Sequence, residues 1–249
     1  MSYHNGPKIV SEGLVLCVDS GNSNSYPGSG TTWFDLNQTH NLTITGATYS
    51  SVYKSLLFSN STNNFSAANY ALKTTQDSTF ALNLLNGRSA FVFFYNTTYL
   101  DAAAPGYFRQ IPMSFGADSS LGGWQIERFT TETNFNLRYK FDQEDVYGNN
   151  ISYGTVPINQ WQCLGWTLNS NQLLLYKNGV QVNSLSVLSK TLNGTITADA
   201  RFGIGSSGYT GTPFYGYIGY ISHASFYNRT LSANEVLQNY NALRGRFGL

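Results

Sequence analysis

Apolar and polar residues alternate along most of the chain, in short runs separated by turn-forming residues. Alternation with a period of two places one set of side chains on each face of a strand, so each run predicts a β-strand. The run at residues 89–95 is apolar at nearly every position, which indicates a central strand. The predicted strands span residues 13–19, 42–48, 55–59, 89–95, 111–116, 124–129, 135–141, 151–156, 161–168, 173–176, 180–185, 201–205 and 215–226.

The last 18 residues carry the one convincing helix signal, and it predicts a helix over residues 232–244. Ser232 is a good N-cap because its hydroxyl can accept a free backbone N–H of the first turn. Glu235 follows three residues later and completes a capping box. Val236 and Tyr240 are spaced to share one helical face, so this helix is expected to dock on strands.

The order of these elements predicts the fold class. Many short strands, a hairpin signal at Asn178-Gly179 and no break in composition indicate one antiparallel β-sandwich with a single C-terminal helix. Residues 1–12 are polar and read as an extended arm, which is either disordered or paired with a neighbouring subunit. Residues 13–249 form one domain that includes the helix.

Composition narrows the class of protein. The 249 residues carry a net charge of +1 and only 11% charged residues, so charge gives no support for a nucleic-acid partner. No apolar run approaches the length of a membrane span, and the N-terminus lacks the pattern of a signal peptide. We therefore expect synthesis in a cytosol without the secretory route. Cys17 and Cys163 lie in apolar runs and are expected to be free thiols rather than a disulfide.

Acidic residues offer only weak candidates for chemistry. A tight cluster at residues 142–145 reads as a polar loop, with a calcium role favoured over a catalytic one. No zinc pattern is present. No cofactor is required by the sequence, and calcium is the one that the acidic residues could hold. The weak metal candidates are Asp19, Asn22, Asp142, Glu144 and Asp199.

Tyrosines crowd a glycine-rich stretch before the closing strand. Such rings can stack on sugars, pack within a sheet or form a subunit interface, where tyrosine is enriched. The sequence favours packing or an interface over sugar binding and leaves all three open. The candidates for a glycan site or an interface are Tyr209, Tyr215, Tyr217 and Tyr220.

With these residues in view, the chain resembles the laminin G-like, concanavalin A-like jelly-roll superfamily, and within it the single-domain proteins common in phage virions. The stretches that carry the resemblance are residues 13–22 with 25–36, Trp161 with 173–179, residues 202–205, and residues 214–218 with 226–240. Two departures stand out. Gly219-Tyr220 occupy a place where many relatives carry an acidic residue, and the acidic signature of the related β-glucanases is absent.

The resemblance implies a two-sheet antiparallel jelly roll and a non-enzymatic structural protein on the surface of a phage particle. A capsid decoration or fibre protein is favoured slightly over a tail adhesin, with attachment to a host-surface glycan as an added role. The alternatives are a carbohydrate-binding lectin module and, less favoured, a glycoside hydrolase of the same fold.

Assembly follows from the same interpretation. The arm and the low charge favour a homo-oligomer, with a trimer preferred because spikes and fibres favour three-fold symmetry. The expected partners are copies of this chain and other virion proteins such as capsid or tail. The expectation includes a cell-surface glycan and excludes nucleic acid and membrane insertion.

Overall fold

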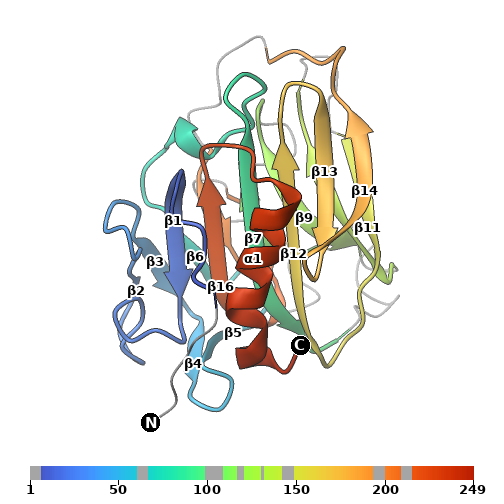
Figure 1. Ribbon diagram of the computed structural model, residues 1–249. Coiled ribbons are helices and arrows are strands. Elements are labelled where there is room, and N and C mark those ends of the chain that lie inside the picture. Colours follow the sequence, from blue (N-terminus) through green and yellow to red (C-terminus); the bar gives the residue numbers. More distant parts are fainter. Residues whose placement is uncertain are drawn as a thin grey trace.

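The computed structural model describes residues 7–60, 67–98, 109–116, 121–129, 132–141, 149–192, 200–208 and 215–249. These residues form two antiparallel sheets packed face to face, with one helix on the outside (Figure 1). The all-β jelly-roll prediction is confirmed.

The first sheet, called sheet A, runs in the order β14-β13-β12-β7-β16-β5-β4, and β1 pairs with β16 beside it. Its strands are β1 (Leu14–Asp19), β4 (Thr48–Ser50), β5 (Ser55–Ser59), β7 (Arg88–Asn96), β12 (Trp161–Leu168), β13 (Gln172–Lys177), β14 (Val180–Ser186) and β16 (Ile218–Tyr227).

The second sheet, called sheet B, runs in the order β11-β10-β9-β8-β15-β6-β3-β2. Its strands are β2 (Thr32–Trp33), β3 (Leu42–Thr45), β6 (Tyr70–Leu72), β8 (Arg109–Phe115), β9 (Trp124–Phe129), β10 (Asn134–Tyr139), β11 (Asn149–Thr155) and β15 (Phe202–Ile204).

Strand β7 is central, as its sequence predicts. It pairs with β12 on one side and with β16 on the other, and eight of its nine residues are buried. Ala90, Val92 and Phe94 face the core between the sheets. Phe91 and Phe93 point to the opposite face of sheet A, because side chains alternate along a strand. Sheet A therefore has an apolar outer face that needs its own cover.

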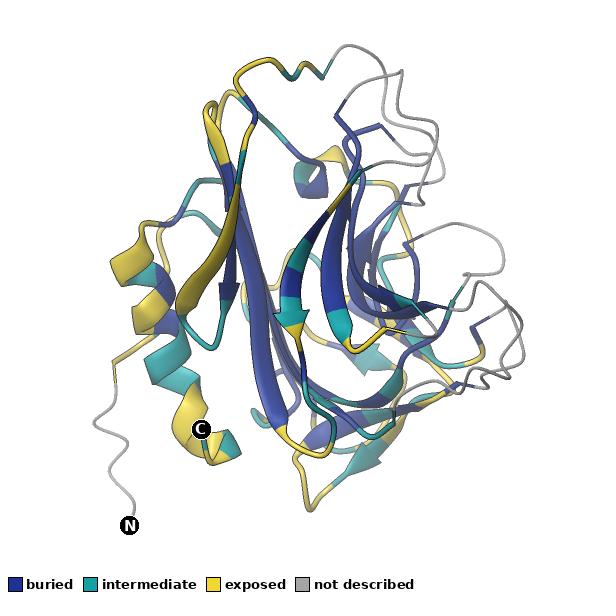
Figure 2. Ribbon diagram, turned by 90° about the vertical axis from the view of Figure 1, so that its right-hand side faces the viewer, coloured by how far each residue is buried: buried dark blue, intermediate teal, exposed yellow. Residues whose placement is uncertain are grey.

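Helix α1 (Ala233–Arg244) provides that cover (Figures 1 and 2). Its predicted capping box is confirmed: the Ser232 hydroxyl accepts from the Glu235 backbone N–H, and the Glu235 carboxylate accepts from the Ser232 backbone N–H at 2.8 Å. Leu231 and Val236 are each 1% exposed and pack with Phe91. The short 3-10 helix η2 (Gly245–Phe247) extends this cover towards the C-terminus.

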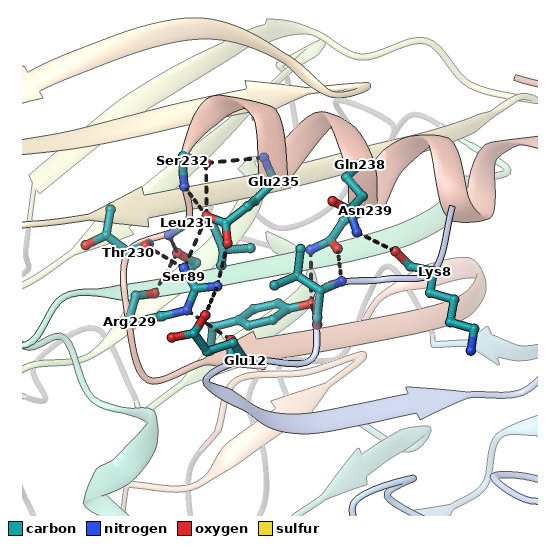
Figure 3. A network of polar contacts seen from close by, with 12 residues as sticks. Lys8, Glu12, Ser89, Arg229, Thr230, Leu231, Ser232, Glu235, Gln238 and Asn239 are labelled. Carbon is teal, nitrogen blue, oxygen red and sulfur yellow. Dashed lines mark hydrogen bonds and ion pairs between the residues drawn. The ribbon is translucent and has the colours of Figure 1, made fainter. Parts of the chain in front are cut away.

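The described part of the arm, residues 7–12, lies against this helix (Figure 3). The Val10 backbone N–H donates to the Asn239 side-chain oxygen at 2.8 Å, and the Val10 carbonyl accepts from the Tyr227 hydroxyl at 3.0 Å. The Gln238 amide donates to the Lys8 carbonyl at 2.8 Å. This half of the arm is thus bonded to its own chain. Residues 1–6 lie outside the described residues.

Two further predictions from sequence are confirmed. Asn178 and Gly179 both have positive φ, 52° and 79°, as a type I′ hairpin requires. A side chain at Gly179 would meet the Tyr240 ring at 2.8 Å, so this turn packs directly on the helix. Cys17 and Cys163 are free and buried.

The predicted pattern misses several short elements. Strands β2 and β6 have two and three residues, which is too short to show an alternating pattern. The 3-10 helix η1 (Ser78–Phe80) lies in a polar stretch. The run predicted as residues 42–48 divides into β3 and β4, with Gly46 at a φ of 69° between them. Among the described residues, no helix combines the length and the apolar character that crossing a bilayer demands.

The helix gives a direct test of the packing. Val236→Ala removes a buried side chain and should lower the free energy of unfolding by on the order of 2 kcal/mol. Leu237→Ala is the matched control, because Leu237 is 42% exposed and should change stability by less than about 0.5 kcal/mol. Urea unfolding measures both. Equal losses for the two variants would show that the helix does not dock through this face.

Candidate functional site

A row of aromatic side chains crosses the outer face of sheet A beyond the end of the helix. Tyr220 of β16 lies directly opposite Tyr95 of β7, and Tyr95 lies directly opposite Trp161 of β12. Side chains opposite each other on one face of an antiparallel pair are within contact distance. Strand pairing therefore gathers three aromatic residues that are far apart in sequence.

The turn between β4 and β5 adds a fourth ring, that of Tyr53. Residues 51–54 form this turn, and Lys54 adopts a positive φ of 47°. The Lys54 carbonyl accepts hydrogen bonds from the Ser20 hydroxyl at 3.1 Å and the Ser222 hydroxyl at 3.0 Å. These bonds tie the turn to the sheet, so Tyr53 is held over the strands.

Tyr53, Tyr95 and Tyr220 form a compact group, called the tyrosine cluster from here on. The ring centroids of Tyr53 and Tyr220 are 4.4 Å apart, and those of Tyr53 and Tyr95 are 5.4 Å apart. Tyr53 is 37% exposed, and the other two are partly exposed. The cluster thus presents aromatic rings and phenolic hydroxyls to solvent on a rigid sheet.

The Tyr95 hydroxyl of the cluster stays uncharged near neutral pH. Burial raises the pKa of Tyr95, and the neighbouring groups of Tyr53 and Tyr220 raise it further. A phenol normally ionises near pH 10, so a raised pKa keeps its hydroxyl as a neutral donor and acceptor. This chemistry suits an uncharged polar ligand with an apolar face.

The other end of the aromatic row is closed. Trp161 is 8% exposed and packs under Phe247 of η2, with ring centroids 4.5 Å apart. Phe247 also stacks on Phe93 at 5.0 Å. The row therefore runs from a covered end below the 3-10 helix to an open end at the tyrosine cluster.

Two of the other tyrosines named from sequence, Tyr215 and Tyr217, do not join this cluster. Tyr217 is fully buried in the core against Phe58 and Phe94, so its ring is not available to a surface ligand. Tyr215 is half-buried and lies 4.9 Å from the Arg109 guanidinium, on the sheet B side. Tyr209 lies outside the described residues. Of the three candidates within the described residues, the structure places only Tyr220 in the cluster.

Asp19, one of the weak metal candidates, is engaged with a cation. Its carboxylate oxygens accept from the Arg246 guanidinium at 2.9 and 2.8 Å, and the His223 ring nitrogen lies 3.9 Å away. Burial alone would raise the pKa of Asp19, but the nearby His223 ring and the ion pair with Arg246 outweigh it and hold that pKa well below its usual range. The Asn22 side chain accepts instead from the Asn24 backbone N–H.

Asp142, Glu144 and Asp199 lie outside the described residues. Within the part of the chain that the structure describes, no three His, Cys, Asp or Glu side chains are grouped to hold a metal ion. A calcium site at any of the five candidates stays a prediction.

The outer face of sheet B holds a charged group that the sequence reasoning missed. Glu127 of β9 is fully buried, and its two carboxylate oxygens accept from Arg138 at 2.7 Å and Arg109 at 3.3 Å. Both guanidinium groups also lie over the Phe129 ring, that of Arg109 at 4.8 Å and that of Arg138 at 5.4 Å from the ring centroid. The signal was present in the runs WQIERF and NFNLRY, where polar residues alternate with core residues on adjacent strands.

This arrangement does not resemble a pair of catalytic carboxylates. Glycoside hydrolysis commonly uses two carboxyl groups on either side of the scissile bond. Glu127 is the one acidic residue in the described strands of sheet B. Its carboxylate is held in ion pairs with Arg109 and Arg138.

The comparison with family models places the chain. Residues 90–237 match the model for the concanavalin A-like lectin/glucanases superfamily, a match over more than half of the chain. The chain belongs to this superfamily. The predicted superfamily is confirmed. No sequence among the curated proteins matches the chain.

Solved structures support the same fold at low sequence identity. A structure of botulinum neurotoxin type C, whose cell entry depends on interaction with two ganglioside molecules, has a TM-score of 0.63 and 12% identity over 93% of this chain and 51% of its own. The sialidase of Trypanosoma rangeli has a TM-score of 0.65 and 13% identity over 96% of this chain and 34% of its own.

A third similar structure is a single domain that this chain matches over nearly the whole length of that domain. It is domain 4 of AbnA, an extracellular arabinanase of Geobacillus stearothermophilus, in complex with arabinotriose. Its TM-score is 0.58, with 16% identity over 91% of this chain and 98% of that domain. The chain thus spans about half of the toxin chain, about a third of the sialidase chain and almost all of the arabinanase domain.

Proposed function

We propose that this protein is a non-enzymatic surface protein of a phage particle that attaches to glycans through the tyrosine cluster. The tyrosine cluster is the observation that carries the glycan part of the proposal. It offers rings for the apolar face of a sugar and neutral hydroxyls for the sugar hydroxyls, on a support fixed by three adjacent strands.

The similar structures support a glycan ligand. The toxin interacts with gangliosides, and the arabinanase domain is in complex with arabinotriose. The phage setting rests on the resemblance of residues 13–36 and 214–240 to single-domain virion proteins. A capsid decoration or fibre protein is favoured over a tail adhesin, and the place of action is the virion surface.

The alternative is a carbohydrate-binding lectin module that is not part of a particle. The tyrosine cluster would bind a glycan in the same way in either case. Locating the protein on purified particles separates the two, because a decoration, fibre or adhesin protein remains with the particle and a free lectin does not. A glycoside hydrolase is less favoured, since Glu127 is paired with two arginines.

Glycan binding should depend on the exposed rings. Tyr220→Ala and Tyr53→Ala each remove a stacking surface and should weaken binding about tenfold or more, equivalent to roughly 1.4 kcal/mol. Val52→Ala, in the same turn and 85% exposed, is the control and should bind like the wild type. A glycan array identifies the ligand, and calorimetry measures the affinities. Wild-type affinity in Tyr220→Ala would exclude the cluster as the site.

Hydrolysis should be absent. We expect no reducing ends to appear when the protein is incubated with β-glucan or arabinan. The variants Asp142→Asn, Glu144→Gln and Glu127→Gln should all give the same blank value. Release of sugar by the wild type that disappears in any one of these variants would overturn the non-enzymatic assignment.

We also propose that the protein is a homo-oligomer, with a trimer preferred, that associates with other virion proteins such as capsid or tail. Strand β14 supports self-association. It is exposed along nearly its whole length, carries no charged residue and presents Val180 at 63% and Val182 at 40% exposure (Figure 2). Natural edge strands are usually protected by charges or proline, because an open edge invites pairing with another chain.

The oligomer is tested by light scattering on the purified chain. A trimer has three times the 27.5 kDa mass of one chain. Val182→Lys places a charge on β14 and should shift the mass towards the monomer, whereas Thr45→Lys, on the exposed side of β3, should not. Deletion of residues 1–6 measures the share contributed by the arm. A monomeric wild-type protein at all concentrations would refute the assembly.

A further inference from the structure

A second surface with the features of a sugar site lies beside β1, away from the tyrosine cluster. A pocket of about 580 Å³ opens there, between the loop that follows β1 and the loop that follows β2. Its lining residues are Asn24, Phe34, Asp35, Leu36, Gln38 and Asn41. All of them belong to the continuous described stretch 7–60.

Phe34 is an aromatic side chain held outward. Its neighbours Trp33 and Asp35 are 0% and 1% exposed, so alternation turns the Phe34 ring to the surface, where it is 42% exposed. The Phe34 backbone is fixed on both sides. Its N–H donates to the Ser25 carbonyl at 2.8 Å, and its carbonyl accepts from the Ser25 hydroxyl at 2.5 Å. An exposed ring on a fixed backbone is a ready stacking surface.

Asp35 fixes the floor of the pocket without being available as a ligand. One carboxylate oxygen accepts from the backbone N–H groups of Cys17 at 2.8 Å and Asn37 at 3.1 Å. The other accepts from the Thr39 backbone and hydroxyl, both at 3.2 Å, and from the His40 backbone at 3.1 Å. Five donors use the acceptor capacity of this carboxylate, so the group shapes the loop and leaves the pocket without a free charge.

Three amide side chains line the pocket together with the Phe34 ring. Asn24, Gln38 and Asn41 are all exposed. The Asn41 side-chain oxygen accepts from the Asp35 backbone N–H at 3.0 Å, which leaves its two N–H donors directed elsewhere. Gln38 has a positive φ of 62°, a strained conformation for a residue other than glycine. Amides offer donors and acceptors together, which matches the paired hydroxyls of a sugar.

We propose that this pocket is a second glycan-binding site, specific for a neutral hexose that stacks on Phe34 and bonds to the surrounding amides. The proposal rests on the glycan-attachment function above and adds a site that shares no residue with the tyrosine cluster. Two sites on one chain raise the strength of attachment to a surface that displays many sugars, because the second contact forms at high effective concentration.

The test is a titration of the isotopically labelled full-length chain, followed by NMR of the Asn and Gln side-chain amides. The probes are the methyl glycosides of glucose, galactose and mannose, each added alone. At least one should give saturable shifts in the side-chain signals of Asn24, Gln38 and Asn41. Phe34→Ala and Asn24→Ala should each weaken this binding about tenfold. Phe34→Trp keeps an aromatic face and should retain it.

Tyr220→Ala is the control that separates the two sites. It should leave the Phe34 titration unchanged and reduce binding on the glycan array. If none of the three glycosides shifts the pocket signals, or if Phe34→Ala binds like the wild type, the second site is wrong while the tyrosine cluster stands. If Tyr220→Ala keeps wild-type binding on the array while the pocket titrates, the proposed cluster fails and the second site remains. The spectrum of each variant reports whether it is folded.

Discussion

The apolar outer face of β7 is the constraint on which the rest of this structure depends. A strand with Phe91, Phe93 and Tyr95 on the side away from the core cannot leave that side open to water without a large cost in hydrophobic free energy. Helix α1 covers Phe91, and η2 covers Phe93. Neither reaches Tyr95. The candidate site is therefore the end of this outer face that neither helix covers. The residues at that end are tyrosines, whose apolar rings can pack on the sheet while their hydroxyls contact water.

The outer faces of the two sheets differ in the polarity of their side chains. The outer face of sheet A is aromatic and uncharged at the cluster, whereas the outer face of sheet B carries Glu127 between Arg109 and Arg138. Removing one partner from such a buried group costs far more than the pair itself contributes, because the other charge is left unpaired. The proposed glycan attachment uses the neutral face of sheet A, whereas the carboxylate on the face of sheet B is held by two arginines.

Local patterns in the sequence predicted what depends on local chemistry. The period of two gave most strands, the Asn178-Gly179 pair gave a hairpin, and Ser232 with Glu235 gave the start of the helix. The sites depend on register and on turns, which local patterns do not encode. Nothing near Tyr220 in sequence indicates that it pairs with Tyr95, or that Tyr53 is held above both by its turn. Tyr217 shows the same limit, because it is buried in the core although it stands only three positions before Tyr220, which lies at the surface.

The pairing of β1 with β16 has a consequence for biosynthesis. Leu14 pairs with Tyr227, so β1 is synthesised about 200 residues before its partner β16. At roughly 5–20 residues per second, that delay is on the order of 10–40 s. Strands β5 and β7 wait for the same partner. During that interval their apolar edges are open, so a cell making much of this protein has to protect the nascent chain until β16 leaves the ribosome.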